Sequence, residues 1–367
     1  MDELILDILK QLRDGSQGAL DTHQLEMLIN AHNSGIDSSA HSTEREKLIP
    51  KRAILPYFLQ VKQNNDELWQ SWNVTSELEE RFIRSVRMKP RRTASGVATI
   101  TVITRPHTCS SNCIYCPCDL RMPKSYLANE PACQRAELTF FDPYVQVAAR
   151  LQALHQMGHS TDKVELIVLG GTWSDYPESY QYWFIKELFR ALNEWPNSPS
   201  HIQERLNWYT SFGLQNSEEA LSSFVAEQQA AVFDDTATYN QAFHKLYDTS
   251  QPHQSAWSQM QSTYDELVEQ QRVNETAAAR VVGLVIETRP DTITPDNLRM
   301  FRQLGCTKIQ IGIQSTRQEI LDANKRQMSA AQIKRAFSLI RLYGFKIHSH
   351  LMVNLLGATP EADKQDF

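Results

Sequence analysis

The sequence lacks the features of a membrane-spanning, secreted or strongly basic protein. No apolar run approaches the roughly 18 residues that would span a bilayer. Lys and Arg number 37 against 43 for Asp and Glu, a formal net charge of -6, which excludes an overall basic surface such as that of a histone. The start, Met1-Asp2-Glu3, is acidic where a secretory signal would be basic. We therefore expect a soluble, cytoplasmic protein without a membrane partner.

Cysteine is also scarce. Six cysteines in 367 residues are too few for a disulfide scaffold, but four of them fall within ten positions, Cys109 to Cys118. In a reducing compartment such clustering indicates metal or redox chemistry. Hydrophobic residues make up 41% and charged residues 22%, the balance of a folded chain. At roughly 150 residues per domain, the length predicts two domains or one barrel with attachments.

Residues 1–88 have the pattern of a small helical domain. Apolar residues recur at helical spacing in the first turns, and Asp21 or Thr22 could cap a second helix. Ser76 opens a further helix, with Glu79 at capping-box spacing. We therefore predict short helices in this region.

From residue 89 onward, β-branched runs alternate with amphipathic helical segments. The expected strands are 97–103, 164–169, 281–286, 308–313 and 346–352. The expected helices are about 141–158, 178–194, 295–304 and 329–343. Near-continuous apolar strands separated by helices predict an α/β fold with a parallel sheet covered by helices.

Two arrangements of this sheet are compatible with the pattern. Eight strand–helix units close a barrel and five make an arc; the alternative is an open doubly wound sheet. We favour a partial (βα) barrel over 89–367, because polar groups follow successive strands, and we expect its C-terminal end to be truncated. About 195–280 form an insertion, expected to be largely helical, to which the sequence assigns no role.

The cysteine cluster follows the first expected strand. Cys109, Cys113 and Cys116 have the spacing C-x3-C-x2-C, with the aromatic Tyr115 just before the third cysteine. Three thiolates on such a loop can hold a 4Fe-4S cluster and leave one iron open to an outside ligand. The pattern resembles the signature of radical S-adenosylmethionine (SAM) enzymes, in which SAM occupies that iron.

A zinc site is the alternative, with Cys118 as fourth ligand. Zinc sites usually pair two C-x2-C hairpins, and this spacing does not. We therefore treat Cys118 as an extra thiol. Cys133 and Cys306 are isolated in the sequence and are expected to be packing residues.

Polar residues follow the second expected strand. The active site of a barrel lies at the carboxyl ends of its strands, and Gly170, Gly171 and Thr172 fall at that position. A double glycine lets backbone carbonyls approach a ligand closely, which suits the SAM ammonium group. The alternative is a tight turn without a ligand.

The later strands end in the same way. Glu287 and Arg289 could bind ribose hydroxyls and a carboxylate, or form an internal ion pair with each other. Gln314 follows the fourth strand, and the fifth carries His348 and His350.

The chain from residue 89 onward resembles the catalytic subunit of Elongator, the radical-SAM tRNA uridine-modifying acetyltransferase family. The matching segments are Lys89-Pro90-Arg91-Arg92-Thr93, Cys113-Ile114-Tyr115-Cys116-Pro117, Pro123-Lys124-Ser125-Tyr126, Gly170-Gly171-Thr172, Glu287-Thr288-Arg289-Pro290-Asp291, Ile311-Gly312-Ile313-Gln314-Ser315 and Gly357-Ala358-Thr359-Pro360-Glu361. They run in order over about three quarters of the chain.

This resemblance implies carboxymethylation at C5 of the wobble uridine of tRNA, with SAM, a 4Fe-4S cluster and acetyl-CoA as co-substrate. It implies that Cys109, Cys113 and Cys116 hold the cluster, and that Lys124 and Tyr126 are catalytic, near the acetyl-CoA and substrate pocket. The residues that it assigns to SAM and its surroundings are Tyr115, Gly170, Gly171, Thr172, Glu287, Arg289 and Gln314.

The sequence also departs from the family. The usual Cys-Pro-Gly-Gly is Cys116-Pro117-Cys118-Asp119, and no segment up to Phe367 is expected to correspond to the family's C-terminal acetyltransferase domain. A separate acetyltransferase domain or Elongator-like subunits are therefore expected as partners, beside tRNA. The alternatives are a radical-SAM enzyme with another substrate, and a non-catalytic tRNA-binding or assembly module with a structural metal.

A basic stripe supports tRNA binding, and we interpret residues 1–88 as a helical N-terminal tRNA-binding region. Residues 81–105 contain no Asp or Glu, and their seven positive charges are Arg81, Arg84, Arg87, Lys89, Arg91, Arg92 and Arg105. Such a stripe can neutralise phosphates. The alternative is a solvated helix face whose charge is balanced by Glu77, Glu79 and Glu80.

Overall fold

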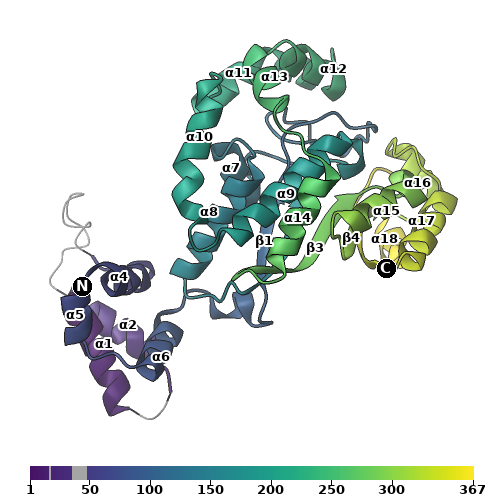
Figure 1. Cartoon of the computed structure of the whole chain (residues 1–367). Coiled ribbons are helices and arrows are strands. Elements are labelled where there is room, and N and C mark those ends of the chain that lie inside the picture. Colours follow the sequence, from purple (N-terminus) through teal and green to yellow (C-terminus); the bar gives the residue numbers. More distant parts are fainter. Residues whose placement is uncertain (16–17, 35–47) are drawn as a thin grey trace. The chain divides into compact units, whose positions relative to one another are not determined.

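The structure is a computed structural model that describes residues 1–15, 18–34 and 48–367. These residues form two compact units (Figure 1). The smaller unit comprises 1–98 with 151–161, and the larger comprises 99–150 with 162–367.

The smaller unit is helical, as predicted. Its helices are α1 (Asp2–Asp14), α2 (Thr22–Asn33), α4 (Lys51–Asn64), α5 (Asp66–Ser71) and α6 (Ser76–Val86), followed by a 3-10 turn, Pro90–Thr93. Asp21 caps α2 in a capping box with Gln24. The predicted capping box of α6 is wrong: Thr75, not Ser76, is the N-cap, and its side chain accepts from the Leu78 N–H. The apolar faces of α1, α4 and α6 share one core, in which Phe58 stacks on Phe82.

The larger unit contains one five-stranded sheet, which confirms the α/β fold class. Its strands are β1 (Ala98–Ile103), β2 (Lys163–Leu169), β3 (Arg280–Thr288), β4 (Lys308–Gln314) and β5 (Lys346–Leu351). The order is β1-β2-β3-β4-β5, and the pairs from β2 to β5 are parallel. A doubly wound sheet reverses its strand order at a switch point, whereas this sheet adds each strand beside the previous one. The order therefore favours the arc of a barrel.

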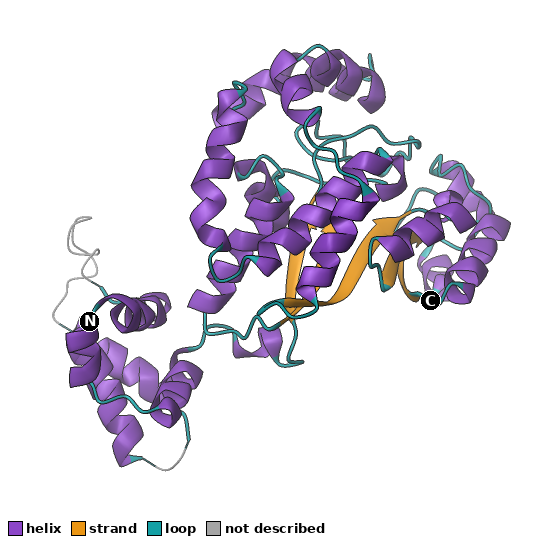
Figure 2. Ribbon diagram, viewed as in Figure 1, coloured by secondary structure: helices purple, strands orange, loops and turns teal. Residues whose placement is uncertain are grey.

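Helices lie between the strands and cover the sheet (Figure 2). They are α7 (Pro131–Leu138), α8 (Pro143–Gln156), α9 (Glu178–Asn193), α15 (Pro295–Gln303), α16 (Gln318–Ala323), α17 (Ala330–Leu342) and α18 (Pro360–Asp366). Most of the apolar side chains of β2, β3 and β4 are fully buried, as expected of a sheet covered by helices.

The insertion lies between α9 and β3 and is helical, as predicted. It contains α10 (Ile202–Ser211), α11 (Glu218–Phe233), α12 (Tyr239–Phe243), a π-helical turn (His244–Asp248), α13 (Gln251–Trp257) and α14 (Tyr264–Asn274). In Figure 1, α10, α11, α13 and α12 lie in that order along an arc, coloured teal to green. The insertion has a small core of its own, which also includes Leu120 from outside it.

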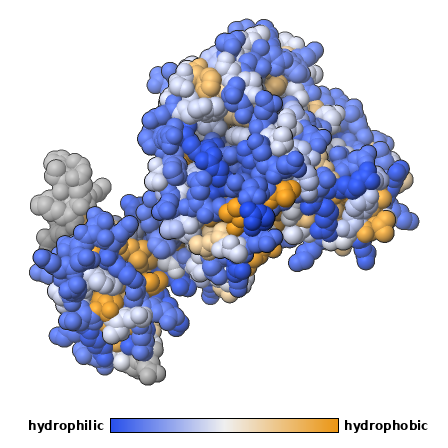
Figure 3. All heavy atoms as spheres, in the orientation of Figure 1, coloured by the Kyte–Doolittle hydropathy of each residue, from blue (hydrophilic) through white to orange (hydrophobic). Residues whose placement is uncertain are grey.

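The visible surface of the larger unit is mainly hydrophilic, with apolar residues in small groups (Figure 3). Within the described ranges, no helix is long and apolar enough to cross a membrane.

Candidate functional site

The three cysteines of the C-x3-C-x2-C motif line one cavity in the larger unit. They lie on the segment between β1 and α7, residues 104–130, called here the cysteine loop. The cavity has a volume of about 60 Å³. The predicted site residues that line it are Cys109, Cys113, Cys116, Lys124, Tyr126, Gly171, Thr172, Glu287, Arg289 and Gln314. The structure therefore brings together residues from the cysteine loop and from the carboxyl ends of β2, β3 and β4.

Cys113 is the most deeply buried of the three, with 4% of its surface exposed. Its sulfur lies 3.2 Å from the Ser111 hydroxyl and 3.5 Å and 3.6 Å from guanidinium nitrogens of Arg326 and Arg289. A hydrogen bond from Cys116, followed by the Ser111 contact and the Arg326 charge, lowers the pKa of Cys113 against the opposing effect of burial. These surroundings favour the thiolate, which is the form that binds metals.

The other two thiols have different surroundings. The hydrogen bond to Cys113, together with burial, raises the pKa of Cys116, so the two thiols share one proton between them more readily than both lose theirs. The Ser125 hydroxyl donates to the Cys116 sulfur at 3.2 Å. The Cys109 sulfur lies 3.5 Å from the Thr172 hydroxyl. Among the described residues, no group of three or more His, Cys, Asp or Glu side chains is arranged to hold a single metal ion.

The carboxyl end of β3 contributes two groups that do not pair with each other. Glu287 accepts a hydrogen bond from the Tyr126 hydroxyl and lies 3.6 Å from His350 of β5. Arg289 instead pairs with Asp291 through two contacts of 2.9 Å and 2.8 Å. The alternative of a Glu287–Arg289 ion pair is therefore wrong. Burial, followed by the Glu287 charge, raises the pKa of Tyr126, so the phenol stays a donor.

Gln314 has an unusual backbone conformation. Its φ is +70°, and the register of β4 with β5 shifts between Gly312 and Gln314. Bulges of this kind redirect a side chain and are common next to active sites. The Gln314 Oε1 atom is buried and has no hydrogen-bond partner among the described residues. An unpaired acceptor beside this cavity can accept a hydrogen bond from a bound ligand.

Lys124 is fixed to the cysteine loop. Only 2% of its surface is exposed, and its ammonium donates to the Ser111 carbonyl at 2.9 Å and to the Asn112 side chain at 3.3 Å. Its charge therefore lies close to the cysteines, and its catalytic role stays a prediction.

Two predicted site residues do not line the cavity. Tyr115 packs against the apolar residues Ile320 and Leu355. Gly170 lies against Thr104, whose hydroxyl donates to the Gly170 carbonyl at 3.3 Å. A glycine is therefore explained at position 170 by the close approach of the ends of β1 and β2.

The remaining cysteines lie apart from the cavity. The Cys118 thiol lies 3.4 Å from the Cys116 carbonyl, and its side chain packs against the core of the insertion. Cys133 and Cys306 are buried, as expected of packing residues.

The basic residues of α6 are partly engaged within the smaller unit. Arg84 pairs with Glu80, and the Arg81 Nε donates to the Gly18 carbonyl at 3.0 Å. Arg87 is half-buried. Part of the predicted stripe thus takes part in local contacts.

The turn after α6 carries the most exposed part of the stripe. Lys89, Arg91 and Arg92 are all exposed. Arg105, in contrast, is buried in the larger unit, where its guanidinium lies 4.0 Å from the ring centre of Trp257 and 4.8 Å from that of Tyr180. Including Arg105 in a basic surface was therefore wrong.

Sequence reasoning missed several residues at the cysteines, among them Arg326 and Ser125. Arg326 is buried, contacts the Cys113 sulfur and donates to the Gly312 carbonyl. It stands in a short loop after α16, and nothing in its sequence context indicates this position. Ser125 lies within the Pro-Lys-Ser-Tyr segment, which was matched to the family without a role for the serine.

Comparisons with known proteins show what this chain is similar to. Residues 255–365 match the family model described as Radical SAM superfamily. A tRNA uridine(34) acetyltransferase of Methanocaldococcus infernus is 33% identical over 80% of this chain and 43% of its own length. One of Dehalococcoides mccartyi is 32% identical over 75% of this chain and 45% of its own.

A solved structure, the archaeal Methanocaldococcus infernus Elp3 with an N-terminal deletion, is 28% identical, with a TM-score of 0.45 over 74% of this chain and 41% of that chain. The chain thus spans less than half the length of the relatives that it matches. Residues 255–365 are thus similar to the radical SAM family model, and the chain is similar to part of proteins named tRNA uridine(34) acetyltransferase and Elongator complex protein 3.

Proposed function

We propose that this chain is the radical-SAM part of an enzyme that modifies C5 of the wobble uridine of tRNA. The observation that carries the proposal is the shared cavity, where three motif cysteines meet polar groups from the ends of β2, β3 and β4. The proposed substrate, uridine 34 of tRNA, comes from the names of the relatives, tRNA uridine(34) acetyltransferase.

The donor types at the cavity, three thiols with nearby guanidinium, carboxylate and amide groups, are those that a 4Fe-4S cluster and SAM would use. Cys109, Cys113 and Cys116 would hold the cluster, and two buried guanidiniums, Arg289 and Arg326, lie beside the Cys113 sulfur, where they offset negative charge. When bound, such a cluster supplies the electron that starts radical chemistry on SAM. The unpaired Gln314 Oε1 would accept a hydrogen bond from SAM.

Glu287 and Tyr126 act as a pair in this proposal. The Tyr126 hydroxyl donates to Glu287, which orients the carboxylate at the end of β3 and leaves its remaining lone pairs for ligand hydroxyls. Carboxylates accept hydrogen bonds from ribose in many nucleotide sites.

Acetyl-CoA is proposed as the acetyl donor, and carboxymethyluridine as the product. Because the chain spans less than half of its relatives, we propose that acetyl transfer needs an acetyltransferase domain in addition to these residues. That domain, or Elongator-like subunits, would be the protein partner.

Anaerobic reconstitution with iron and sulfide tests the proposal. We expect about four irons per chain and release of 5′-deoxyadenosine from SAM after reduction, stimulated by tRNA. Cys113→Ala should abolish both, whereas Cys118→Ala, the matched control in the same loop, should retain them. Zinc in place of iron in anaerobically purified protein would refute the proposal, and stimulation by small molecules but not tRNA would refute its substrate.

A further inference from the structure

The insertion contacts the cysteine loop through the side-chain amide of Asn240. Asn240 belongs to α12, and its Oδ1 accepts a hydrogen bond from the Cys109 N–H at 3.1 Å. Its Nδ2 donates to the Cys109 carbonyl at 2.8 Å. One side chain thus satisfies both backbone polar groups of the first motif cysteine, in the way that a neighbouring strand would.

Gln229 of α11 makes the same kind of contact after the third motif cysteine. Its Nε2 donates to the Cys118 carbonyl at 2.8 Å, and its Oε1 accepts from the Leu120 N–H at 2.8 Å. The two amides therefore bracket the stretch of chain that carries all three cysteines. Each contact joins residues more than 100 positions apart in the sequence.

Two buried tyrosines of the insertion strengthen this attachment. The Tyr239 hydroxyl donates to the Met122 carbonyl at 2.9 Å, and the Tyr247 hydroxyl donates to the Leu120 carbonyl at 2.7 Å. Leu120 also lies in the apolar core of the insertion. The loop is therefore held by both hydrogen bonds and packing.

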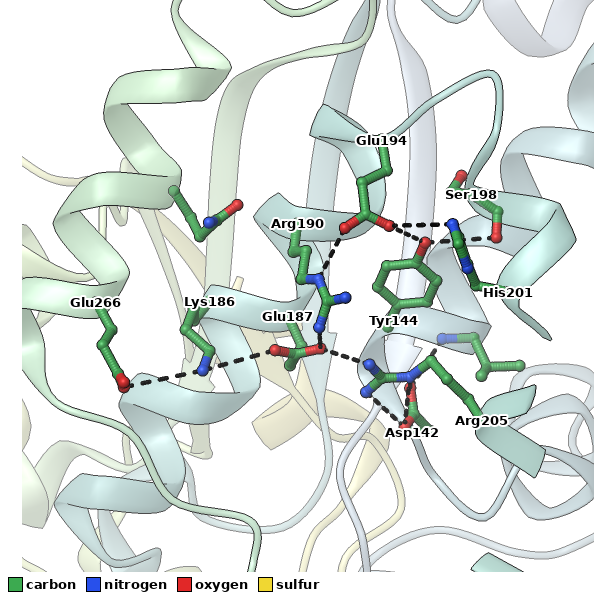
Figure 4. Close-up of polar contacts among 12 residues, drawn as sticks. Asp142, Tyr144, Lys186, Glu187, Arg190, Glu194, Ser198, His201, Arg205 and Glu266 are labelled. Atoms are coloured by element: carbon green, nitrogen blue, oxygen red, sulfur yellow. Dashed lines mark hydrogen bonds and ion pairs between the residues drawn. The ribbon is translucent and has the colours of Figure 1, made fainter. Parts of the chain in front are cut away.

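The other end of the insertion is fixed by a network of ion pairs around Arg205 of α10 (Figure 4). Arg205 lies 2.9 Å from Asp142, just before α8, and 2.8 Å from Glu187 of α9. The Tyr209 hydroxyl donates to Asp142 at 2.8 Å. The insertion thus connects the helices that cover the sheet with the cysteine loop.

We propose that the insertion preorganises the cysteine loop for cluster binding, with Asn240 and Gln229 as positioning residues. The cysteine loop has no regular secondary structure from residue 104 to the start of α7. Holding such a segment in one conformation costs backbone entropy, which the two amide contacts offset. Ligands held in place before the metal arrives bind it more tightly. The identity of the bound group rests on the proposed function; the positioning of the loop does not.

Hydrogen–deuterium exchange on the cluster-free protein tests the positioning. Asn240→Ala should speed exchange of the Cys109 amide about tenfold, and Gln229→Ala that of the Leu120 amide, because each variant removes the acceptor. Asn207→Ala, an exposed amide on α10, is the matched control and should change neither. Unchanged exchange in both test variants would overturn the proposal.

The isosteric variant Asn240→Asp separates hydrogen bonding from packing. It keeps the acceptor for the Cys109 N–H and removes the donor to the Cys109 carbonyl, so exchange at the Cys109 amide should stay near the wild-type rate. The rate at which a chelator removes iron from reconstituted protein should lie between those of the wild type and Asn240→Ala. Equal exchange in the Asp and Ala variants would contradict the hydrogen-bond role.

The two proposals fail in distinguishable ways. Wild-type protein that takes up no iron–sulfur cluster refutes the proposed function, while the exchange rates still decide whether the insertion positions the loop. Wild-type protein that binds the cluster, with variants that exchange and lose iron at the wild-type rate, refutes only the positioning.

Discussion

At the residue scale, Gly170 shows how a missing side chain sets the approach of two strand ends. Its φ is +134°, and a Cβ there would lie 2.0 Å from the Thr104 hydroxyl oxygen. We therefore expect Gly170→Ala to lower the free energy of unfolding by about 2–4 kcal/mol, through strain and overlap together. Urea unfolding followed by circular dichroism measures this loss.

Gly213→Ala is the control for Gly170. Gly213 also has a positive φ, +87°, but its added Cβ would meet only Pro252, at 3.9 Å. Its cost should therefore be the backbone strain alone, about 1 kcal/mol. Equal losses for the two variants would contradict the proposed overlap with Thr104.

His253 makes stability depend on pH. Burial, followed by the charge of Arg105, lowers the pKa of His253 to about 4 from its usual 6.5. Unfolding therefore takes up a proton between these values, and the free energy of unfolding should fall by up to about 3 kcal/mol as the pH is lowered from about 6.5 to 4.

The variant His253→Phe tests this. Its ring can still stack on Phe224, as that of His253 does, so the fold should persist while the dependence on pH weakens. Unfolding midpoints in urea at pH 7 and pH 4.5 give the comparison. An equally steep dependence in both proteins would refute the assignment to His253.

The chemistry-bearing cysteines were predictable at this scale, because a spacing over eight residues is visible in the sequence. Arg326, Asn240 and Gln229 were not, because each acts on a residue more than 100 positions away. The sequence pointed to Gly170 as a position where a ligand comes close to the backbone. In the structure the group that comes close to it is the Thr104 side chain.

At the scale of elements, the strands were predicted closely and the contacts of the insertion were not. The expected runs 97–103 and 308–313 correspond to β1 at Ala98–Ile103 and β4 at Lys308–Gln314. Both runs are rich in β-branched residues, Val, Ile and Thr in β1 and Ile in β4, and these residues favour strands and mark their bounds in the sequence. The helical character of the insertion could be predicted. The partners of its polar side chains could not, because they lie far away in the sequence.

The ion pairs of Arg205 hold the insertion to α8 and α9, so replacing Arg205 should lower the free energy of unfolding. Arg205→Met would leave the buried carboxylates of Asp142 and Glu187 without their main partner. We expect a loss of about 3–5 kcal/mol in the free energy of unfolding, the usual cost of breaking a buried pair from one side. Urea unfolding provides the measurement.

Arg272→Met is the matched control for Arg205. Arg272 pairs with Glu269 on the exposed surface of α14, so its loss should hardly move the unfolding midpoint. Similar shifts for both variants would show that the Arg205 network does not hold the insertion.

At the scale of the whole molecule, a net charge of -6 conceals a local basic turn. Lys89, Arg91 and Arg92 are exposed on it. Reversing two charges, Arg91→Glu with Arg92→Glu, should weaken tRNA binding and reduce the slope of log K against log salt by about 2. Filter binding over a salt series measures both.

The pair Lys334→Glu and Arg335→Glu makes the same charge change on α17, at exposed positions. In this control, the affinity for tRNA and the slope of log K against log salt should stay close to those of the wild type. If the Arg91 and Arg92 variant binds tRNA at low salt as tightly as the wild type does, the basic turn is not part of the tRNA site.

The two amide contacts also have a consequence for engineering and evolution. Because Asn240 and Gln229 replace backbone partners that the cysteine loop lacks within itself, a loop moved to another protein would need the insertion to go with it. A chimaera that receives residues 104–130 alone would inherit the ligands without their support. Homologues that shorten the insertion should therefore show compensating substitutions around the first and third cysteines.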